Sequence, residues 1–448
     1  MKGAKIAVFI GILLVMVLPY WYYTSVNDYY SFSNGKFIVH TLEKDLIEEK
    51  VEDGKEYLFR VLDDDYHGVH KYYYATTDTF ENRLHSIYTA STAFTLFKIY
   101  GYNNDKEVMD QILKSGEFIL SMQNKKKDKG YGAFHYSVFL EGYEKEERYV
   151  VGTTSKTIFT LLLLYDETGD DKYLEAAKLG ADWLLTMQLE NGNLKSSISL
   201  RDGKWYGTSK QSYLYNGQVL SALSRIYRAT GKEEYFFAAD RIASNFLSEV
   251  ESVGCYVGDD YRANNPISSS WLILALYDYY LASGDEQVKD IVFRCSEELL
   301  GRQKVDPTDL ENYGRWRGSL STSGAGWLAE VFVEIYKFCL EEEKENCDKY
   351  KDSIVKALRW TIQQTYSKEN SKQAENIKFA NGGIYWNEET RYVRTDAVCH
   401  GLNAYVGILP YLEEGVLISE NSEDLETNEK EPVPFSSKIG ICILLVLI

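Results

Sequence analysis

The feature that most constrains this chain is a recurring pair of helical patterns. In each pair an amphipathic segment comes first, a long polar loop follows, and a more uniformly apolar segment ends the unit. The starts of the amphipathic segments lie about 53 to 65 residues apart, a spacing typical of repeat architectures. These segments are predicted at 43–62, 106–123, 172–188, 233–250, 286–303 and 348–364. Three of them end alike, in Gln123, Gln188 and Gln303.

The second helix of each pair is apolar on most sides, which indicates a buried helix. These helices are predicted at 84–100, 155–165, 211–228, 267–281, 326–340 and 396–411. Short Gly-containing turns link each one to the next unit, so neighbouring helices should run antiparallel. Six such hairpins predict an all-α fold, a closed (α/α)6 toroid with the apolar helices inside. An open solenoid is the competing architecture.

The two ends of the chain differ from the repeats. Residues 6–23 are almost wholly apolar, follow Lys2 and Lys5, and end in an aromatic cluster without a small-residue cleavage site. This pattern predicts an uncleaved, single-pass N-terminal transmembrane anchor with the globular domain outside the cytoplasm. The predicted organisation is an anchor (1–26), a tether (27–42), the toroid (43–412), an acidic linker (413–437) and an apolar C-terminal segment (438–448). The last segment is read as a membrane contact, a processing signal or a clipped span.

Composition narrows the possible partners. The net charge of −18 argues against a protein that binds the phosphate backbone of nucleic acids. It leaves room for a local basic groove that binds an acidic ligand. The six cysteines are too few for a dense disulfide framework. Cys339 and Cys347 are close enough in sequence to pair across a helix end.

In a closed ring, the long loops before the inner helices all gather at one face, where function is expected. These loops are rich in Tyr, Trp, Arg and His, which suits a sugar that carries carboxylate or sulfate groups. The candidate substrate-binding residues are His135, Trp205, Tyr206, Arg262, Arg315, Trp316 and Arg317. The plainer interpretation is that charged loop residues merely solvate the surface.

No P-loop, GxGxxG, GxSxG or HExxH motif occurs in the chain, and we predict no cofactor and no resident metal. Three chemistries remain compatible with the loop residues. The first is glycoside hydrolysis by paired carboxylates. The second is proton abstraction next to a sugar carboxylate, as in epimerisation or β-elimination. The third is a zinc site that uses Cys399 and His400.

Residues 205–409 resemble the C-terminal helical domain of D-glucuronyl C5-epimerases. The resemblance is carried by Tyr-Asn-Gly-Gln at 215–218, by the stretch from Tyr261 to Ser270, and by Gly-Ile-Tyr at 383–385. It continues through Arg-Thr-Asp at 394–396 and the segment 400–403. The family tyrosine that follows Arg-x-Asp is replaced here by Ala397.

That resemblance implies a set of catalytic residues. Tyr261 and Tyr385 would serve as acid and base on opposite faces of a uronate. Arg391 or Arg394 would neutralise the sugar carboxylate. The full implied set is Tyr261, Tyr385, Arg391, Arg394, Asp396 and His400.

Cys399-His400-Gly401 is also similar to the zinc motif of lanthionine synthetase cyclases, which are toroids too. A remaining cysteine ligand would have to come from another repeat, and Cys255 is the nearest loop candidate.

The expected function is therefore a membrane-anchored, extracytoplasmic, carbohydrate-active protein. The leading version is a glucuronyl C5-epimerase-like enzyme that acts on a uronic-acid-containing glycan. The alternatives are a glycoside hydrolase or polysaccharide lyase on the same toroid, a non-catalytic protein that binds a glycan or a partner, and a lanthionine cyclase-like zinc protein.

Overall fold

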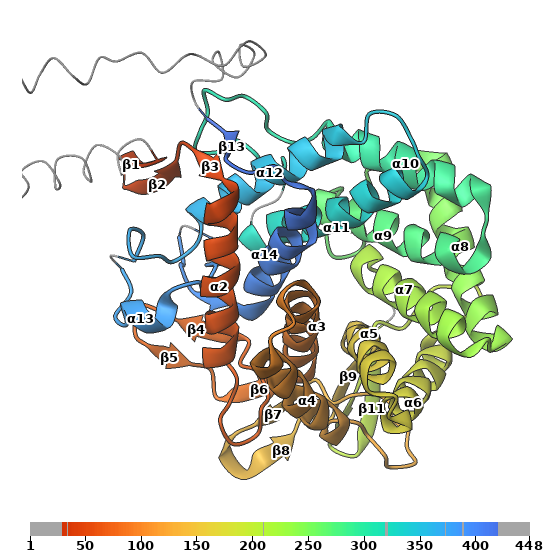
Figure 1. The fold of residues 1–448 in the computed structure, drawn as a ribbon. Coiled ribbons are helices and arrows are strands. Elements are labelled where there is room, and N and C mark those ends of the chain that lie inside the picture. The colour runs from red at the N-terminus through yellow and green to blue at the C-terminus, as the bar shows by residue number, and fades with distance from the viewer. Residues whose placement is uncertain are drawn as a thin grey trace, which may run out of the picture.

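The structure, a computed structural model, describes residues 29–33, 35–208, 210–318, 321–371, 373–387 and 389–419. In this part of the chain two concentric rings of helices enclose a common axis (Figure 1). The inner helices are α3 (Ser86–Asn103), α5 (Val151–Thr168), α7 (Tyr213–Thr230), α9 (Pro266–Ser283), α11 (Thr322–Glu341) and α14 (Thr395–Ile408). The outer helices are α2 (Lys44–Arg60), α4 (Lys106–Ser121), α6 (Asp171–Met187), α8 (Glu233–Val253), α10 (Glu286–Leu300) and α12 (Asp348–Gln363). A short helix, α13 (Ile377–Ala380), lies in the last long loop.

The inner ring is closed. Each inner helix packs against the next, and α14 packs against α3 as well as against the first outer helix, α2. The prediction of an (α/α)6 toroid is confirmed, and the solenoid alternative is wrong. α5 and α11 begin four residues earlier than predicted, because the residues at 151–154 and 322–325 are buried in the first turns of these helices rather than lying in loops.

The caps explain where the helices begin and end. Asp105, Asp170 and Asp285 each accept a hydrogen bond from the backbone N–H two residues later and start an outer helix. At the ends of inner helices, Gly231 and Gly284 adopt left-handed φ values of 68° and 69°. Each cap fixes a short turn between an inner helix and the next outer helix.

The all-α prediction implied irregular long loops, but these loops contain regular secondary structure. They contain short antiparallel strands, namely β4 (Tyr72–Tyr74), β5 (Thr79–Phe80), β6 (Arg83–His85), β7 (Ser137–Phe139), β8 (Glu144–Lys145), β9 (Arg148–Val150), β10 (Ser197–Arg201), β11 (Lys204–Thr208) and β12 (Val393–Arg394). β6 pairs with β7, and β9 with β10, so the first long loop is tied to the second and the second to the third. β12 pairs with β4, which ties the last long loop to the first.

The predicted tether and the start of the predicted linker contain ordered strands. A hairpin of β1 (Tyr30–Ser33) and β2 (Lys36–Val39) lies against α12, and the side chains of Phe37, Ile38 and Val39 are buried. β3 (Leu42–Glu43) pairs with β13 (Val416–Ile418), so the two ends of the described chain lie side by side.

The recurring glutamines have a structural role. The side-chain amide of Gln123, at the end of α4, donates to the carbonyl of Ala176 in α6 at 2.8 Å. Gln188 donates in the same way to Ala238 of α8, and Gln303 to Ser353 of α12. Each glutamine therefore fastens one outer helix to the next.

A glycine with positive φ follows several of these helix ends, and it lies in close contact with the backbone of the next outer helix. A Cβ added to Gly132 would lie 2.2 Å from the carbonyl oxygen of Leu179, and one added to Gly314 would lie 1.9 Å from that of Lys356. Gly192 and Gly382 show the same close approach, to Arg241 and Asp53. A side chain at these positions would separate neighbouring repeats.

The two disulfides join neighbouring parts of the ring. The predicted pair Cys339–Cys347 is confirmed, and a second pair, Cys255–Cys295, was not predicted. Cys255 lies in the loop after α8, and Cys295 lies in α10. This disulfide joins a loop to the next outer helix, as the glutamine and glycine contacts do in other repeats.

The predicted membrane segments, 1–26 and 438–448, lie outside the described residues. Within the described ranges, no helix combines the length and the apolarity needed to cross a bilayer.

The glycine contacts lead to a stability prediction. Gly314→Ala should lower the free energy of unfolding by about 2–4 kcal/mol, because it adds overpacking against a backbone carbonyl to the strain of positive φ. Gly284→Ala is the matched control. Its φ is +69° but nothing lies within 4 Å of an added Cβ, so it should cost about 1 kcal/mol. Urea unfolding of both variants checks this. Equal losses would show that the contact with the next helix contributes nothing.

Candidate active site

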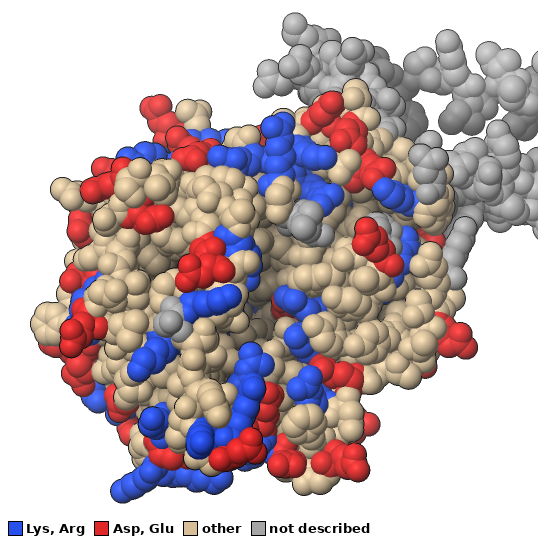
Figure 2. All heavy atoms as spheres, turned by 180° about the vertical axis from the view of Figure 1, so that it is seen from behind, with Lys and Arg blue, Asp and Glu red and all other residues tan. Residues whose placement is uncertain are grey.

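The face that carries the long loops is hollowed near its centre. Figure 2 shows this face, with Lys and Arg side chains gathered around the hollow. The net charge of the whole chain is −18, so this concentration of basic side chains is local. Such a face attracts acidic ligands.

A histidine–glutamate pair lies between two inner helices. His400 Nδ1 of α14 is 2.6 Å from Glu330 Oε2 of α11, and the two side chains are 13% and 7% exposed. Asn403 donates to the other oxygen of Glu330 at 3.0 Å. The imidazole also contacts Trp327 edge to face at 5.1 Å. In the described part of the chain no hydrogen bond reaches Nε2, which leaves this nitrogen available for proton transfer.

The electrostatics of this pair favour an ionised carboxylate. Burial alone would raise the pKa of Glu330, but His400 and two nearby lysines outweigh it and lower the pKa to about 2. A carboxylate fixed in this way orients the imidazole and stabilises its protonated form.

A glycine of α11 lets the two helices that carry this pair come close together. A Cβ added to Gly326 of α11 would lie 3.0 Å from the backbone nitrogen of Gly401 and 3.3 Å from His400 Cβ. The small residue therefore permits the backbone approach that places His400 beside Glu330.

Arg394 and Asp396 form a second charged pair at the start of α14. The guanidinium binds both oxygens of the carboxylate, and Ser323 donates to Asp396 at 3.1 Å. Burial raises the pKa of Asp396, but Arg394 outweighs this effect and lowers it overall. The guanidinium also stacks 3.7 Å above the ring of Trp386. Arg394 and Asp396 thus neutralise each other at the mouth of the inner ring.

The structure brings three predicted catalytic residues together and separates the others. Arg394, Asp396 and His400 share the first turns of α14. Tyr385 is fully buried, and its hydroxyl donates to the carbonyl of Gln363 at 3.0 Å. Arg391 is 8% exposed, and its guanidinium lies 5.1 Å from the ring centre of Tyr385. Neither side chain faces the hollow, because both pack into the core beneath the last loop.

Tyr261 and Arg262 lie on the exposed rim. Tyr261 is 45% exposed, and its hydroxyl is 3.3 Å from Ser196 Oγ. Trp205 and Tyr206 belong to β11, where Tyr206 is exposed and Trp205 is half-buried. These residues are placed where a bound glycan can contact them.

The remaining substrate-binding candidates divide by burial. His135 is buried, and its Nδ1 lies 3.0 Å from the carbonyl of Glu146. Trp316 is fully buried and stacks on Phe332. Both are core residues, so they are not available to a ligand. Arg317 is exposed, and Arg315 is half-buried with its guanidinium 5.6 Å from the ring centre of Trp360.

The zinc interpretation receives no support from the geometry. Cys255, its second cysteine, is bonded to Cys295, and Cys399 is buried beside Thr92. The described residues contain no group of three His, Cys, Asp or Glu side chains that could hold a metal ion.

Glu330 is the residue that sequence reasoning missed. A single carboxylate within the apolar run of α11 was the available signal, because a buried charge needs a partner. Its partner is 70 residues away in sequence, and no local pattern connects the two.

The lowered pKa of Glu330 predicts a pH-dependent stability. An unfolded glutamate titrates near 4.5, so the Glu330 charge stabilises the fold above that pH and loses its contribution as the pH falls towards 2. Glu330→Gln should lower the free energy of unfolding at neutral pH by on the order of 1–3 kcal/mol and make its decline in acid shallower. Urea titrations at several pH values measure both effects. Glu341→Gln, an exposed change on the same helix, is the control, and an unchanged acid decline in Glu330→Gln would contradict the prediction.

Comparison with known proteins adds the fold context. No protein-family model and no curated protein sequence matches the chain. Solved structures do match. A cellobiose 2-epimerase from Bacillus thermoamylovorans has a TM-score of 0.63 at 13% identity, covering 82% of this chain and 100% of its own. An α-1,6-mannanase variant from Salegentibacter sp. HEL1_6 in complex with mannotriose has a TM-score of 0.59 at 11% identity, over 82% and 100% of the two chains. An unsaturated glucuronyl hydrolase specific for heparin has a TM-score of 0.57 at 14% identity, over 82% and 98%. These identities establish the shared six-hairpin toroid fold and no more.

Proposed function

We propose that this protein is a carbohydrate-active enzyme that epimerises a sugar by moving the proton on a carbon next to a carboxylate. The observation that carries the proposal is the His400–Glu330 pair between α11 and α14. The proteins of similar fold support a sugar substrate, because their names describe epimerases and hydrolases of sugars.

The charge states favour proton abstraction over glycoside hydrolysis. A hydrolase needs a carboxyl group that stays protonated and donates to the leaving oxygen. Glu330 and Asp396 both have lowered pKa values and are therefore ionised at neutral pH. An imidazole held by an ionised carboxylate can instead accept a proton from carbon.

In the proposed reaction His400 acts as the base. Nε2 removes the proton from C5 of a uronate, the electron pair moves into the carboxylate as an enediolate, and Glu330 stabilises the imidazolium. A proton delivered to the opposite face of C5 then completes the inversion. Tyr261 is our candidate for this second group, since Tyr385 is enclosed in the core. Exposed Arg262 is the candidate partner of the substrate carboxylate.

A second candidate function is epimerisation at C2 of a reducing sugar, where the acidic proton lies next to an aldehyde. Two observations favour it. The proposed base, His400, belongs to an inner helix, and Arg394 is already paired with Asp396. An aldehyde, unlike a carboxylate, needs no free arginine.

We also propose that the domain works outside the cytoplasm, held by the predicted N-terminal anchor. The pairs Cys255–Cys295 and Cys339–Cys347 support this location, because structural disulfides form in oxidising compartments. Finding both pairs as free thiols in protein isolated from its native cells would contradict it.

The reaction is tested by incubating the protein in heavy water with glucuronate-containing polysaccharides and, separately, with cellobiose. Deuterium at C5 of the uronate, without chain cleavage, is the expected NMR result. Deuterium at C2 of the reducing sugar would select the second candidate. Cleavage products would overturn both epimerase proposals in favour of a hydrolase or lyase. Binding without exchange or cleavage would indicate a glycan-binding protein.

Variants then assign the base. His400→Gln should reduce exchange at least about 100-fold, the usual contribution of a general base. His40→Gln is the matched control, because His40 follows the hairpin strand β2, outside the inner ring. If Tyr261 delivers the proton to the opposite face of C5, Tyr261→Phe should slow inversion at C5 more than it slows exchange of the C5 proton with solvent. Full exchange in a folded His400→Gln protein would remove His400 from the mechanism.

A further inference from the structure

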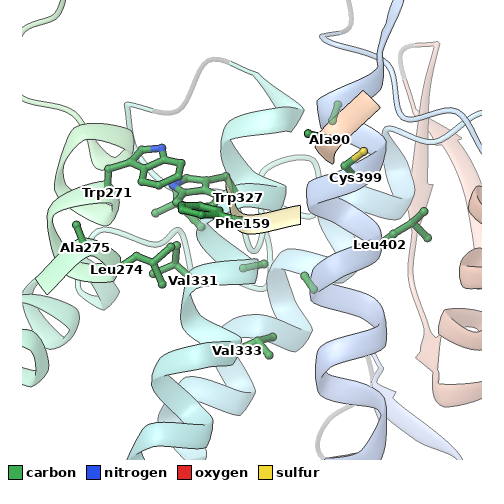
Figure 3. Close-up of a cluster of buried hydrophobic side chains, with 14 of the residues drawn as sticks. Ala90, Phe159, Trp271, Leu274, Ala275, Trp327, Val331, Val333, Cys399 and Leu402 are labelled. Carbon is green, nitrogen blue, oxygen red and sulfur yellow. The ribbon is translucent and has the colours of Figure 1, made fainter. Parts of the chain in front are cut away.

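A cavity of about 560 Å³ lies between the inner helices α3, α5 and α11, and Glu330 of the His400–Glu330 pair is among its lining residues. Its walls include the rings of Phe94, Phe97, Phe159 and Trp327. Figure 3 shows Phe159 beside Trp271 and Trp327, whose rings stack at 4.0 Å. The size is that of a small-molecule site.

Lys156 of α5 lines this cavity. Lys156 as a whole is 7% exposed. The ammonium position is surrounded by four rings, with Nζ 5.4 Å from the ring centre of Phe94, 5.2 Å from that of Phe159, and 5.7 Å from those of Trp271 and Trp327. Within the described ranges the amine has no hydrogen bond and no ion pair. The structure thus holds a buried amine in an aromatic enclosure with space beside it.

Other lysines of low exposure in the fold are paired. Lys50 binds Asp53 at 2.9 Å, and Lys55 binds Glu52 at 2.7 Å. Lys98 lines the same cavity as Lys156 but binds Glu334 at 3.0 Å. A buried lysine usually needs such a carboxylate, so Lys156 departs from the pattern of this protein.

The surroundings of Lys156 disfavour its charged form. Burial lowers its pKa, and the nearby positive charges of Arg225 and Lys98 lower it further, while Glu330 opposes them only in part. In Lys98 burial acts in the same direction, but Glu334 outweighs it and the pKa is raised. At neutral pH a larger fraction of Lys156 is therefore the free amine, which is the nucleophilic form.

We propose that Lys156 is a carbonyl-reactive site, at which a small aldehyde or ketone with an apolar body forms an imine. The amine nitrogen attacks the carbonyl carbon and a C–N bond forms. The carbonyl oxygen then leaves as water with the two amine hydrogens, and a C=N bond remains. No oxidant, reductant or metal is needed.

The cavity walls fit this class of ligand better than a small anion. The rings and Leu274 offer apolar contact to the body of an aldehyde. The cations that line the cavity, Lys98, Lys337 and Arg225, share it with Glu330 and Glu334, whose lowered pKa values keep both carboxylates charged, so an anion would meet repulsion as well as attraction. A neutral carbonyl compound meets no such repulsion.

The experiment treats the folded, full-length protein with benzaldehyde and cyanoborohydride at neutral pH and maps benzylated lysines by peptide mass spectrometry. Lys156 should be modified faster than Lys98, because the pKa of Lys156 is lowered and that of Lys98 is raised. In unfolded protein the preference should disappear. No modification of Lys156 while exposed lysines react would overturn the proposal, whether the cause is a closed cavity or an unreactive amine.

Two variants sharpen the test. Lys156→Arg should abolish labelling at this position and leave the labelling of exposed lysines unchanged. Glu334→Gln, which removes the partner of Lys98, should make Lys98 reactive in the same cavity. If Lys98 stays unlabelled in a folded Glu334→Gln protein, the absence of an ion pair is not what confers reactivity. This readout measures lysine labelling and not sugar epimerisation, so the labelling can fail while the function proposed for the His400–Glu330 pair holds, and the reverse.

Discussion

The architecture depends on the contact between each loop and the outer helix of the next repeat. At Gly132 and Gly314 the loop backbone touches a helix carbonyl so closely that a Cβ has no room. The glutamines at 123 and 303 donate to the same neighbouring helices. Because several repeats are fastened to the next one in this way, local contacts contribute to the curvature of the ring. The loops that carry the hollow are thereby held at fixed positions relative to one another.

Charged side chains at the centre of the ring are paired with one another across the inner helices. Lys98 pairs with Glu334, and Arg225 pairs with Asp278. Glu330 is shared between His400 and Asn403. Removing one member of such a set leaves the others uncompensated, which costs more than the pairs contribute when intact. The inner helices are therefore bound to one another by a charged interior as well as by apolar packing.

Sequence reasoning recovers the parts of this structure that depend on short-range patterns. Amphipathic periodicity located the outer helices, and the eight-residue separation of Cys339 and Cys347 suggested their pairing. The short strands were missed because their partners belong to other repeats, as with Val393 opposite Tyr73. Arg394, Asp396 and His400 lie within seven residues at the start of α14, so the sequence alone places them near one another. Glu330 comes close to them only because the ring of helices closes. Nothing in the loop sequence shows that the side chain of Tyr385 turns inward.

The pairing of β3 with β13 has a further consequence. Leu42 and Ile418 are opposite each other, so the polypeptide enters and leaves the ring at one seam between α2 and α14. A ring joined in this way has no privileged first repeat, and circular permutants should fold. A short linker across the seam, with new ends opened at the turn of Gly231, would preserve the contacts of the inner and outer helices. The fold then does not require a particular repeat to come first in the sequence, because the repeats are arranged around a common axis.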